Sequence, residues 1–276
     1  LSKRRTTMKR LIYLVASLMA CISVSAQKTM CLWQGANSTL ISLSDAGTMS
    51  FGNNGSTITI AGNTYQVSDI DSLTILKSVT VAYSEGSAVV DIPEALSNDV
   101  KAEVNGAHVE LTNTNVSNEI EVSLSGTASD GSFTYNGIYK TTIRLAGLDL
   151  TSKQGAALDI ECGKRVNVVL EKGTTNSLAD YAQGTQKACF YCRGHVEVEG
   201  SGTLNVTGNL THAIKTKEYL QLKKSTGTIN ILKAAGDAMH VGQYYQQNGG
   251  MVNITSTTQA DGIQVEVLTL DDDITP

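Results

Sequence analysis

The chain has 276 residues, of which 41% are apolar, so it can bury a large core and its composition excludes a disordered protein. Its net charge of −5 argues against a nucleic-acid partner, since no Lys or Arg cluster follows the N-terminal segment. The 25 glycines, the two prolines and the many Thr, Val, Ile and Ser residues indicate short strands joined by tight turns. These features predict an all-β protein.

Residues 1–26 have the organisation of a secretory signal peptide. Five Lys or Arg residues between positions 3 and 10 precede the apolar run 11–24, and the small residues at 24–26 predict cleavage before Gln27. The run is too short to span a bilayer, so no transmembrane span is expected in the mature chain. A lipid anchor at Cys21 is an alternative to this cleavage. The segment predicts a secreted or cell-surface bacterial protein.

Four cysteines remain after the predicted cleavage. Cys189 and Cys192 form a C-x-x-C motif, but three positions apart in a strand they face opposite sides and cannot easily form a disulfide. Neither a second such pair nor a His at ligand spacing accompanies them, so a zinc site is not indicated. We expect these two residues, like Cys31 and Cys162, to be small buried side chains.

Two β-rich regions are expected before the main repeat. Residues 27–78 alternate β-like segments with Gly/Asn turns, and their opening (MCLW at 30–33) and close (DIDSLTI at 69–75) resemble a leader module of exported bacterial surface proteins. Residues 79–118 show the alternation of an antiparallel pair around an Asn105-Gly106 turn. This second region is a candidate cap for the open end of the repeat that follows.

From residue 119 the chain is organised by a repeat of about 24 residues. The phrase Gly-x-apolar-Asn-apolar begins at Gly202, Gly227 and Gly250, with spacings of 25 and 23 residues. An apolar residue preceded by a small one opens each unit, at positions 158, 190, 214, 239 and 263, and the long first step predicts an insertion near residues 174–187. A second apolar pair follows, as in Val166 and Val168. Three short strands per turn predict a parallel β-helix over residues 119–276.

A leucine-rich repeat has a similar period, but the chain lacks its Leu-x-x-Leu-x-Leu frame. In a β-helix, the side chains next to the inward ones point outward and form ladders along the solenoid. The asparagines of the repeated phrase, at 205, 230 and 253, predict one hydrogen-bonded ladder of this kind.

A second outward stripe follows the first strand of each turn. It consists of the residue after each opening apolar position: Asp159, Tyr191, Lys215, His240 and Gln264. Polar groups and an aromatic ring along an elongated face suit a sugar chain, whose hydroxyls need partners and whose rings stack. The alternative is an ordinary solvated strand face.

Asp237 and Asp261 occupy the same place in successive turns, 24 residues apart. Carboxylates one rung apart lie about 5 Å from each other and repel by about 3 kcal/mol at an effective dielectric near 20, which favours protonation of one or a bound cation. In a secreted protein we expect this cation to be calcium, which prefers oxygen ligands such as these carboxylates. Alternatively, both residues only shape turns.

Lys215 and Lys217 could serve a lyase as its catalytic base, but exposed lysines on strands are usually only charged surface residues. No catalytic residue is therefore assigned.

Five motifs occur in an order that resembles a known family: GAALDI at 155–160, GTTNSLAD at 173–180, GSGTLNV at 200–206, HAIKTK at 212–217 and ADGI at 260–263. From about Val122 onward the chain resembles secreted bacterial carbohydrate-binding-domain proteins, whose fold is a right-handed parallel β-helix like that of pectate lyases. The resemblance implies binding of cellulose- or pectate-type polysaccharides, with calcium bound on the helix. Members usually continue through further Asp-Gly-apolar turns, so the sequence is expected to be truncated at its C-terminus.

We therefore predict an exported, non-catalytic protein that binds polysaccharide on the first-strand face of a right-handed parallel β-helix, with calcium as an expected cofactor. Two other classes remain open, namely a calcium-dependent polysaccharide lyase and a surface adhesin or structural protein. The sequence assigns neither the glycan nor the oligomeric state.

Overall fold

The computed structural model describes residues 29–35, 37–42, 47–75, 77–255 and 260–266. Within these ranges the protein is all-β, as predicted, with 26 strands and three short 3-10 segments, at Asn53–Gly55, Val67–Asp69 and Glu94–Leu96. None of its described helices is long and apolar enough to cross a membrane. The predicted signal peptide, the alternative anchor at Cys21 and the cleavage before Gln27 lie outside the described residues.

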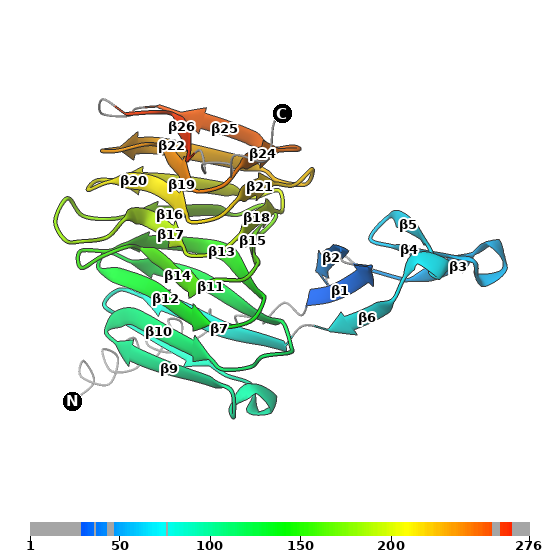
Figure 1. The fold of residues 1–276 in the computed structure, drawn as a ribbon. Coiled ribbons are helices and arrows are strands. Elements are labelled where there is room, and N and C mark those ends of the chain that lie inside the picture. Colours follow the sequence, from blue (N-terminus) through cyan, green and yellow to red (C-terminus); the bar gives the residue numbers. More distant parts are fainter. Residues whose placement is uncertain (1–28, 36, 43–46, 76, 256–259, 267–276) are drawn as a thin grey trace, which may run out of the picture.

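The first six strands form two small antiparallel sheets, which Figure 1 shows beside the main stack of rungs. One sheet has the order β2 (Asn37–Ser42), β1 (Thr29–Gln34), β6 (Ser72–Ile75), and the other has the order β3 (Ser50–Gly52), β4 (Thr57–Ile60), β5 (Asn63–Gln66). They share a small apolar core made of Met30, Leu32, Ile41, Ile58 and Ile60. This core is separate from that of the solenoid.

The rest of the described chain winds into a solenoid with three parallel faces (Figure 1). The first face stacks one strand per turn: β10 (Ala107–Asn113), β12 (Gly131–Gly137), β14 (Leu158–Cys162), β17 (Ala188–Cys192), β20 (His212–Thr216), β23 (Met239–Val241) and β26 (Ile263–Val265). Each of these strands pairs in parallel with the next. The prediction of a parallel β-helix is therefore confirmed.

The long strands β11 (Ile120–Ala128) and β13 (Thr141–Thr151) each turn a corner and contribute to both remaining faces. The second face continues through β15 (Val166–Leu170), β18 (Val196–Glu199), β21 (Leu220–Leu222) and β24 (Tyr245–Gln247). The third face continues through β16 (Thr175–Ala179), β19 (Thr203–Gly208), β22 (Thr228–Ala234) and β25 (Met251–Ile254).

The inward columns lie where the repeat predicted them. Successive Cα partners on the first face are Leu158, Phe190, Ile214, Met239 and Ile263, and all but Ile263 are buried. The small residues before them, Ala157, Cys189, Ala213 and Ala238, are fully buried at the corner that opens the face. Cys31, Cys162, Cys189 and Cys192 are all buried, which confirms their predicted role as small core side chains.

The asparagine ladder on the third face is also confirmed. Asn205, Asn230 and Asn253 are Cα partners on successive rungs. Asn230 Nδ2 donates to Asn205 Oδ1 at 2.8 Å, and Asn253 Nδ2 donates to Asn230 Oδ1 at 2.9 Å. Because each amide both donates and accepts along the axis, the ladder stabilises the stacking of rungs.

The solenoid begins earlier than the repeated phrase indicates. The hairpin around Asn105 and Gly106 is present between β9 (Val100–Asn105) and β10, and β8 (Ser87–Asp91) pairs antiparallel with β7 (Lys77–Ser84). However, β7 and β10 also pair in parallel with β11 and β12, so they are the first rungs of the solenoid sheets. Residues 175–179, expected within an insertion, form the third-face strand β16, and the loop that lengthens this turn follows it.

Candidate functional site

Outward side chains of the first face form one column along the solenoid. Its register places Asp159, Tyr191, Lys215, His240 and Gln264 on successive rungs. Thr134 and Glu110 continue the column toward β10. Since neighbouring strands lie about 4.8 Å apart, the five predicted residues span about 19 Å. They share one surface, whereas their role in binding stays a prediction.

Part of this column is covered. Tyr191 is 3% exposed, because Lys187 from the loop after β16 places its Nζ 4.6 Å from the centre of the tyrosine ring. His240 is 8% exposed. The expectation of a fully exposed stripe is therefore wrong for these two residues. Tyr191 can stack on a sugar ring only after Lys187 moves, so the accessible groups of the column are Asp159, Lys215 and Gln264.

Asp159 is the most unusual group of the column. Among the described residues its Oδ1 atom is buried and has no hydrogen-bond partner. Burial, and then the negative charge of Glu161, raise the pKa of Asp159 to about 6, while Lys187 acts in the opposite direction. A buried carboxyl group without a hydrogen-bond partner destabilises the folded protein when it is ionised. Such destabilising groups are common among residues that serve a binding site.

The replacement Asp159→Asn is expected to stabilise the protein at pH 7. The unfolded chain keeps a proton on this group only below about pH 4, whereas the folded protein keeps it up to about pH 6. The free energy of unfolding therefore falls as pH rises from 4 to 6 and stays lower above that. Because the carboxyl is partly solvated, we expect a gain of about 1–2 kcal/mol for the variant at pH 7.

Urea denaturation at pH 4 and pH 7 measures this difference. The two proteins should have equal stability at pH 4, where Asp159 is protonated and resembles an amide in charge. A gain that is the same at both pH values would contradict the buried-charge explanation.

A groove of about 510 Å³ borders the C-terminal ends of the first-face strands. Its lining includes Asn136, Ile138, Glu161, Lys164 and Arg193. Glu161 follows Asp159 by two positions on the outward side of β14, so the groove continues the polar column. The two cationic side chains give it donors suited to carboxylates.

An aromatic ladder lies at the corner between the first and second faces. The rings of Tyr219 and Tyr244 are stacked with centroids 4.8 Å apart and an interplanar angle of 14°. The His195 ring lies 4.6 Å from the Tyr219 ring. Tyr244 is exposed and ends the described stack. The two tyrosine rings therefore stack on each other.

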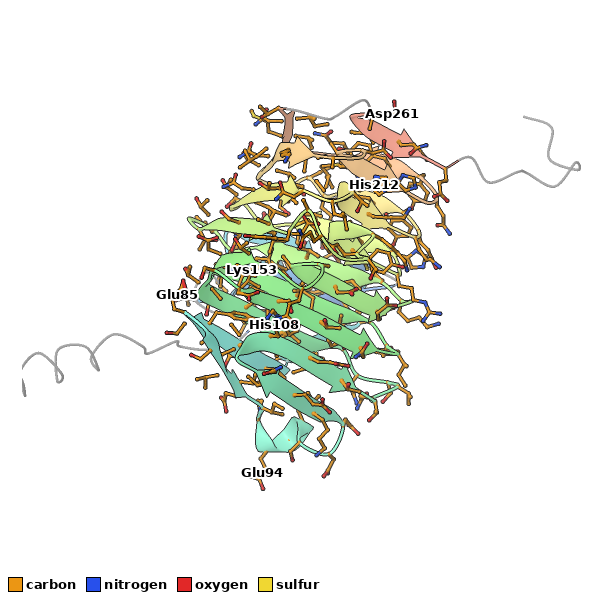
Figure 2. All side chains as sticks on the ribbon, turned by 90° about the vertical axis from the view of Figure 1, so that its left-hand side faces the viewer. Glu85, Glu94, His108, Lys153, His212 and Asp261 are labelled. Carbon is orange, nitrogen blue, oxygen red and sulfur yellow. The ribbon has the colours of Figure 1, made fainter. Side chains whose placement is uncertain are left out.

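A cluster of two histidines and an aspartate lies near the other end of the column. His212 opens β20, Asp237 precedes β23 by two residues, and His240 is the second residue of β23. Asp237 Oδ2 lies 3.2 Å from His212 Nδ1 and 2.8 Å from His240 Nδ1. The other nitrogen of His240, Nε2, lies 2.6 Å from Glu266 Oε1. Figure 2 shows His212 and Asp261 at the end of the solenoid that is distant from His108.

Electrostatics keep this cluster in mixed charge states. Burial, and then the neighbouring His240, lower the pKa of His212 to about 4, so its ring is neutral at pH 7. Burial opposes ionisation of Asp237, but hydrogen bonds from His240 and from the backbone of Asp261 outweigh it and lower the pKa of this carboxyl. Asp237 is therefore ionised and accepts from His240, whereas its own backbone N–H donates to His212 Nδ1.

The predicted pair Asp237 and Asp261 does lie on successive rungs, and the Asp261 backbone N–H donates to Asp237 Oδ1 at 3.0 Å. A turn-shaping Asp237 would make this bond, and calcium binding by the pair stays a prediction. Asp261 is exposed, and the side chains gathered around Asp237 are those of His212 and His240. Calcium prefers six to eight oxygen ligands, so this mixed nitrogen and oxygen set fits it poorly.

The sequence offered signals for this cluster. His212 holds the position of Asp237 one turn earlier, and His240 follows Asp237 by three residues. What the sequence could not show is that Asp237 turns toward both rings. Glu266 was missed because it is not the register partner of His240. That partner is Gln264, and Glu266 follows it by two residues on the next rung.

A parallel β-helix with a polar column along one face is an elongated scaffold of the kind that repeat proteins use for binding. Residues 105–273 match the family described as carbohydrate-binding domain-containing protein. Because this match covers more than half of the chain, the chain belongs to that family.

Two further comparisons agree with this assignment. A carbohydrate-binding domain-containing protein of Acetivibrio thermocellus is 27% identical over 115 residues, which are 38% of this chain and 40% of the relative. The chain thus matches well under half of that protein's length. The solved structure of a polysaccharide lyase-like protein from C. thermocellum, a gadolinium derivative, has a TM-score of 0.58 at 23% identity and covers 72% of this chain and 76% of that one. At this identity the likeness establishes the fold alone.

Proposed function

We propose that the protein is exported, binds an extended polysaccharide of the cellulose or pectate type along the first face, and does not cleave it. Membership of a carbohydrate-binding family supports the ligand class. Export rests on the N-terminal segment of the sequence. N-terminal sequencing of protein recovered from the culture medium tests it, with Gln27 as the expected first residue.

The observation that carries the proposal is the register of the first-face column. Its residues repeat once per rung, about every 4.8 Å, and so present polar groups at regular intervals to a polymer with a regular repeat. Asp159, Lys215 and Gln264 offer a carboxyl, an ammonium and an amide in one line. Asp159 is half-buried, so the accessible part of its carboxyl can accept from a sugar hydroxyl, whereas the buried and unpartnered Oδ1, judged over the described residues, needs a side-chain rotation to do so.

The adjoining groove favours a glycan that carries carboxylates. Lys164 and Arg193 line it together with Asn136, and both cations can pair with uronate groups. A neutral glucan would leave these charges unused. Within the two glycan types, we therefore expect the pectate type to bind more tightly at low salt, where such pairs are least screened.

The double variant Asp159→Asn/Lys215→Ala tests the face. Loss of hydrogen bonds to one or two charged groups should weaken binding by about tenfold or more. The matched control is Asp149→Asn/Lys233→Ala, which makes the same chemical changes at exposed positions of the third face. Affinity electrophoresis in polygalacturonate and pull-down on insoluble cellulose measure both variants. Equal affinities for the two doubles would place the binding surface elsewhere.

The same assays separate the other classes. Release of unsaturated sugar products would identify a lyase, and failure to bind any glycan would favour an adhesin or structural protein. Calcium is a separate part of the proposal. If it assists binding, a calcium chelator lowers the affinity and added calcium restores it, whereas unchanged affinity would remove calcium from the proposed function.

A further inference from the structure

We propose that His212, Asp237 and His240 bind a divalent transition-metal ion of the zinc class. In the described part of the chain, these three side chains offer ligand atoms that all lie within 4.8 Å of one another. Metal binding by this cluster does not require that the first face binds a polysaccharide.

The solenoid builds the cluster from two consecutive rungs. His212 and Asp237 occupy equivalent positions before the inward residues Ile214 and Met239, which are Cα partners. Asp237 and His240 are three residues apart around the start of β23. The two imidazole rings lie side by side, with centroids 4.4 Å apart and an interplanar angle of 36°. Since backbone pairing on both rungs fixes these positions, the three ligands are brought together before any ion binds.

Two of the three ligand-to-ligand distances suit a small tetrahedral ion, and the two histidine ligand atoms lie within 4.8 Å of each other. Bonds of about 2.0–2.1 Å place neighbouring ligand atoms of a zinc site about 3.3 Å apart. In the cluster, Asp237 Oδ2 lies 3.2 Å from His212 Nδ1 and 2.8 Å from His240 Nδ1. An ion bonded to these three atoms would keep its fourth position for water. The ion would replace the proton that Asp237 and His240 share. His212 Nδ1 now accepts a hydrogen bond from the Asp237 backbone N–H at 3.0 Å, and this bond would break so that the nitrogen lone pair could bind the ion.

The surroundings provide an outer ligand shell. When His240 binds an ion through Nδ1, its Nε2–H points at Glu266 Oε1, 2.6 Å away. A carboxylate that accepts from the far nitrogen of a ligating histidine orients the ring and raises its basicity. The charged groups that face the cluster are Asp237, Glu266 and Lys215, whose Nζ lies 3.9 Å from Glu266 Oε1. With neutral histidines these groups carry one net negative charge, which favours a cation.

The donor set distinguishes this site from a calcium site. Imidazole nitrogens are ligands for zinc, cobalt, nickel and copper, whereas calcium takes oxygen ligands almost exclusively. Two of the three ligands here are imidazoles. His212 keeps 20% of its side-chain surface exposed, and the more buried Asp237 and His240 keep 9% and 11%, so an ion can enter from the His212 side without unfolding of the rungs.

The test uses the full chain after removal of metals with a chelator. Co²⁺ is added as a spectroscopic probe, and Zn²⁺ and Ca²⁺ are titrated in competition with a chromophoric chelator. We expect one equivalent of Co²⁺ with the visible absorption of a tetrahedral site, displacement by Zn²⁺, and binding of Zn²⁺ at least about 100-fold tighter than Ca²⁺. A wild-type protein that binds neither Co²⁺ nor Zn²⁺ overturns the proposal without any variant.

Variants locate the ion. His212→Gln and His240→Gln should each weaken Zn²⁺ binding by more than about tenfold, and Glu266→Gln by about tenfold. His195→Gln is the matched control, because His195 contacts Glu218 and Tyr219 outside the cluster and should leave the affinity unchanged. Should a cluster variant fail to fold, anomalous scattering from a Zn²⁺-soaked wild-type crystal decides the location. An ion found away from these residues, or equal losses in the control, would contradict the assignment.

Discussion

Replacing Phe190 by alanine is expected to lower the free energy of unfolding by about 3–5 kcal/mol. The Phe190 side chain is 1% exposed and belongs to the inward column of the first face, between Leu158 and Ile214. Each of these rungs is held by backbone pairing on both sides. The walls of the resulting cavity can therefore collapse only slightly, so both the lost burial and the void contribute to the cost.

Denaturation in urea, followed by circular dichroism, measures the change. Phe51→Ala is the matched control, since Phe51 is 69% exposed on β3 of the N-terminal sheets and its loss should change stability by less than about 0.5 kcal/mol. Solenoids unfold as coupled neighbouring units, so a broader transition for the Phe190 variant is also expected. Comparable effects of the two replacements would show that the inward column does not carry the stability of the fold.

The fold was predictable because each strand pairs with its own copy one turn later. A position on one rung meets the equivalent position on the next, so a fixed sequence period becomes a spatial column. Leu158 to Ile263, Asn205 to Asn253 and Asp159 to Gln264 are all columns of this kind. The alternation of side chains then separates inward from outward residues without further information.

The start of the solenoid was not predictable from the same signal. The hairpin turn at Asn105 and Gly106 correctly indicates that β9 and β10 are antiparallel. A strand has two edges, however, and the turn does not predict which strand pairs with the second edge of β10. The opposite edge of β10 pairs in parallel with β12, and the repeated phrase does not occur there to reveal it.

Contacts that leave the column also escaped prediction. Alternation shows that Tyr191 points outward, but whether an outward ring is exposed depends on the loop that carries Lys187. Likewise, the sequence period aligns His212 with Asp237, but it does not determine the side-chain rotamer that directs the Asp237 carboxylate toward His240. Such details decide the chemistry of the candidate site, and they follow from packing between neighbouring side chains.

The second large effect is expected for Gly227→Ala, which should lower the free energy of unfolding by about 3 kcal/mol. Gly227 begins the middle copy of the repeated phrase. A Cβ atom there would overlap the carbonyl oxygen of Gly202 and lie 2.7 Å from the carbonyl carbon of Ser201. Both belong to the backbone of the preceding turn, which cannot rotate away as a side chain can. The glycine is thus required by the close approach of successive rungs.

Gly155→Ala supplies the control for this variant. Gly155 lies in a turn, has a backbone conformation open to other residues, and a Cβ there would meet no atom within 4 Å. Its replacement should leave stability unchanged or raise it by up to about 1 kcal/mol, because alanine restricts the unfolded chain. Urea midpoints of the two variants give the comparison. If both lose stability equally, the repeated glycine reflects turn propensity. If only Gly227→Ala does, the glycine of the phrase marks where one turn of the solenoid rests directly on the next.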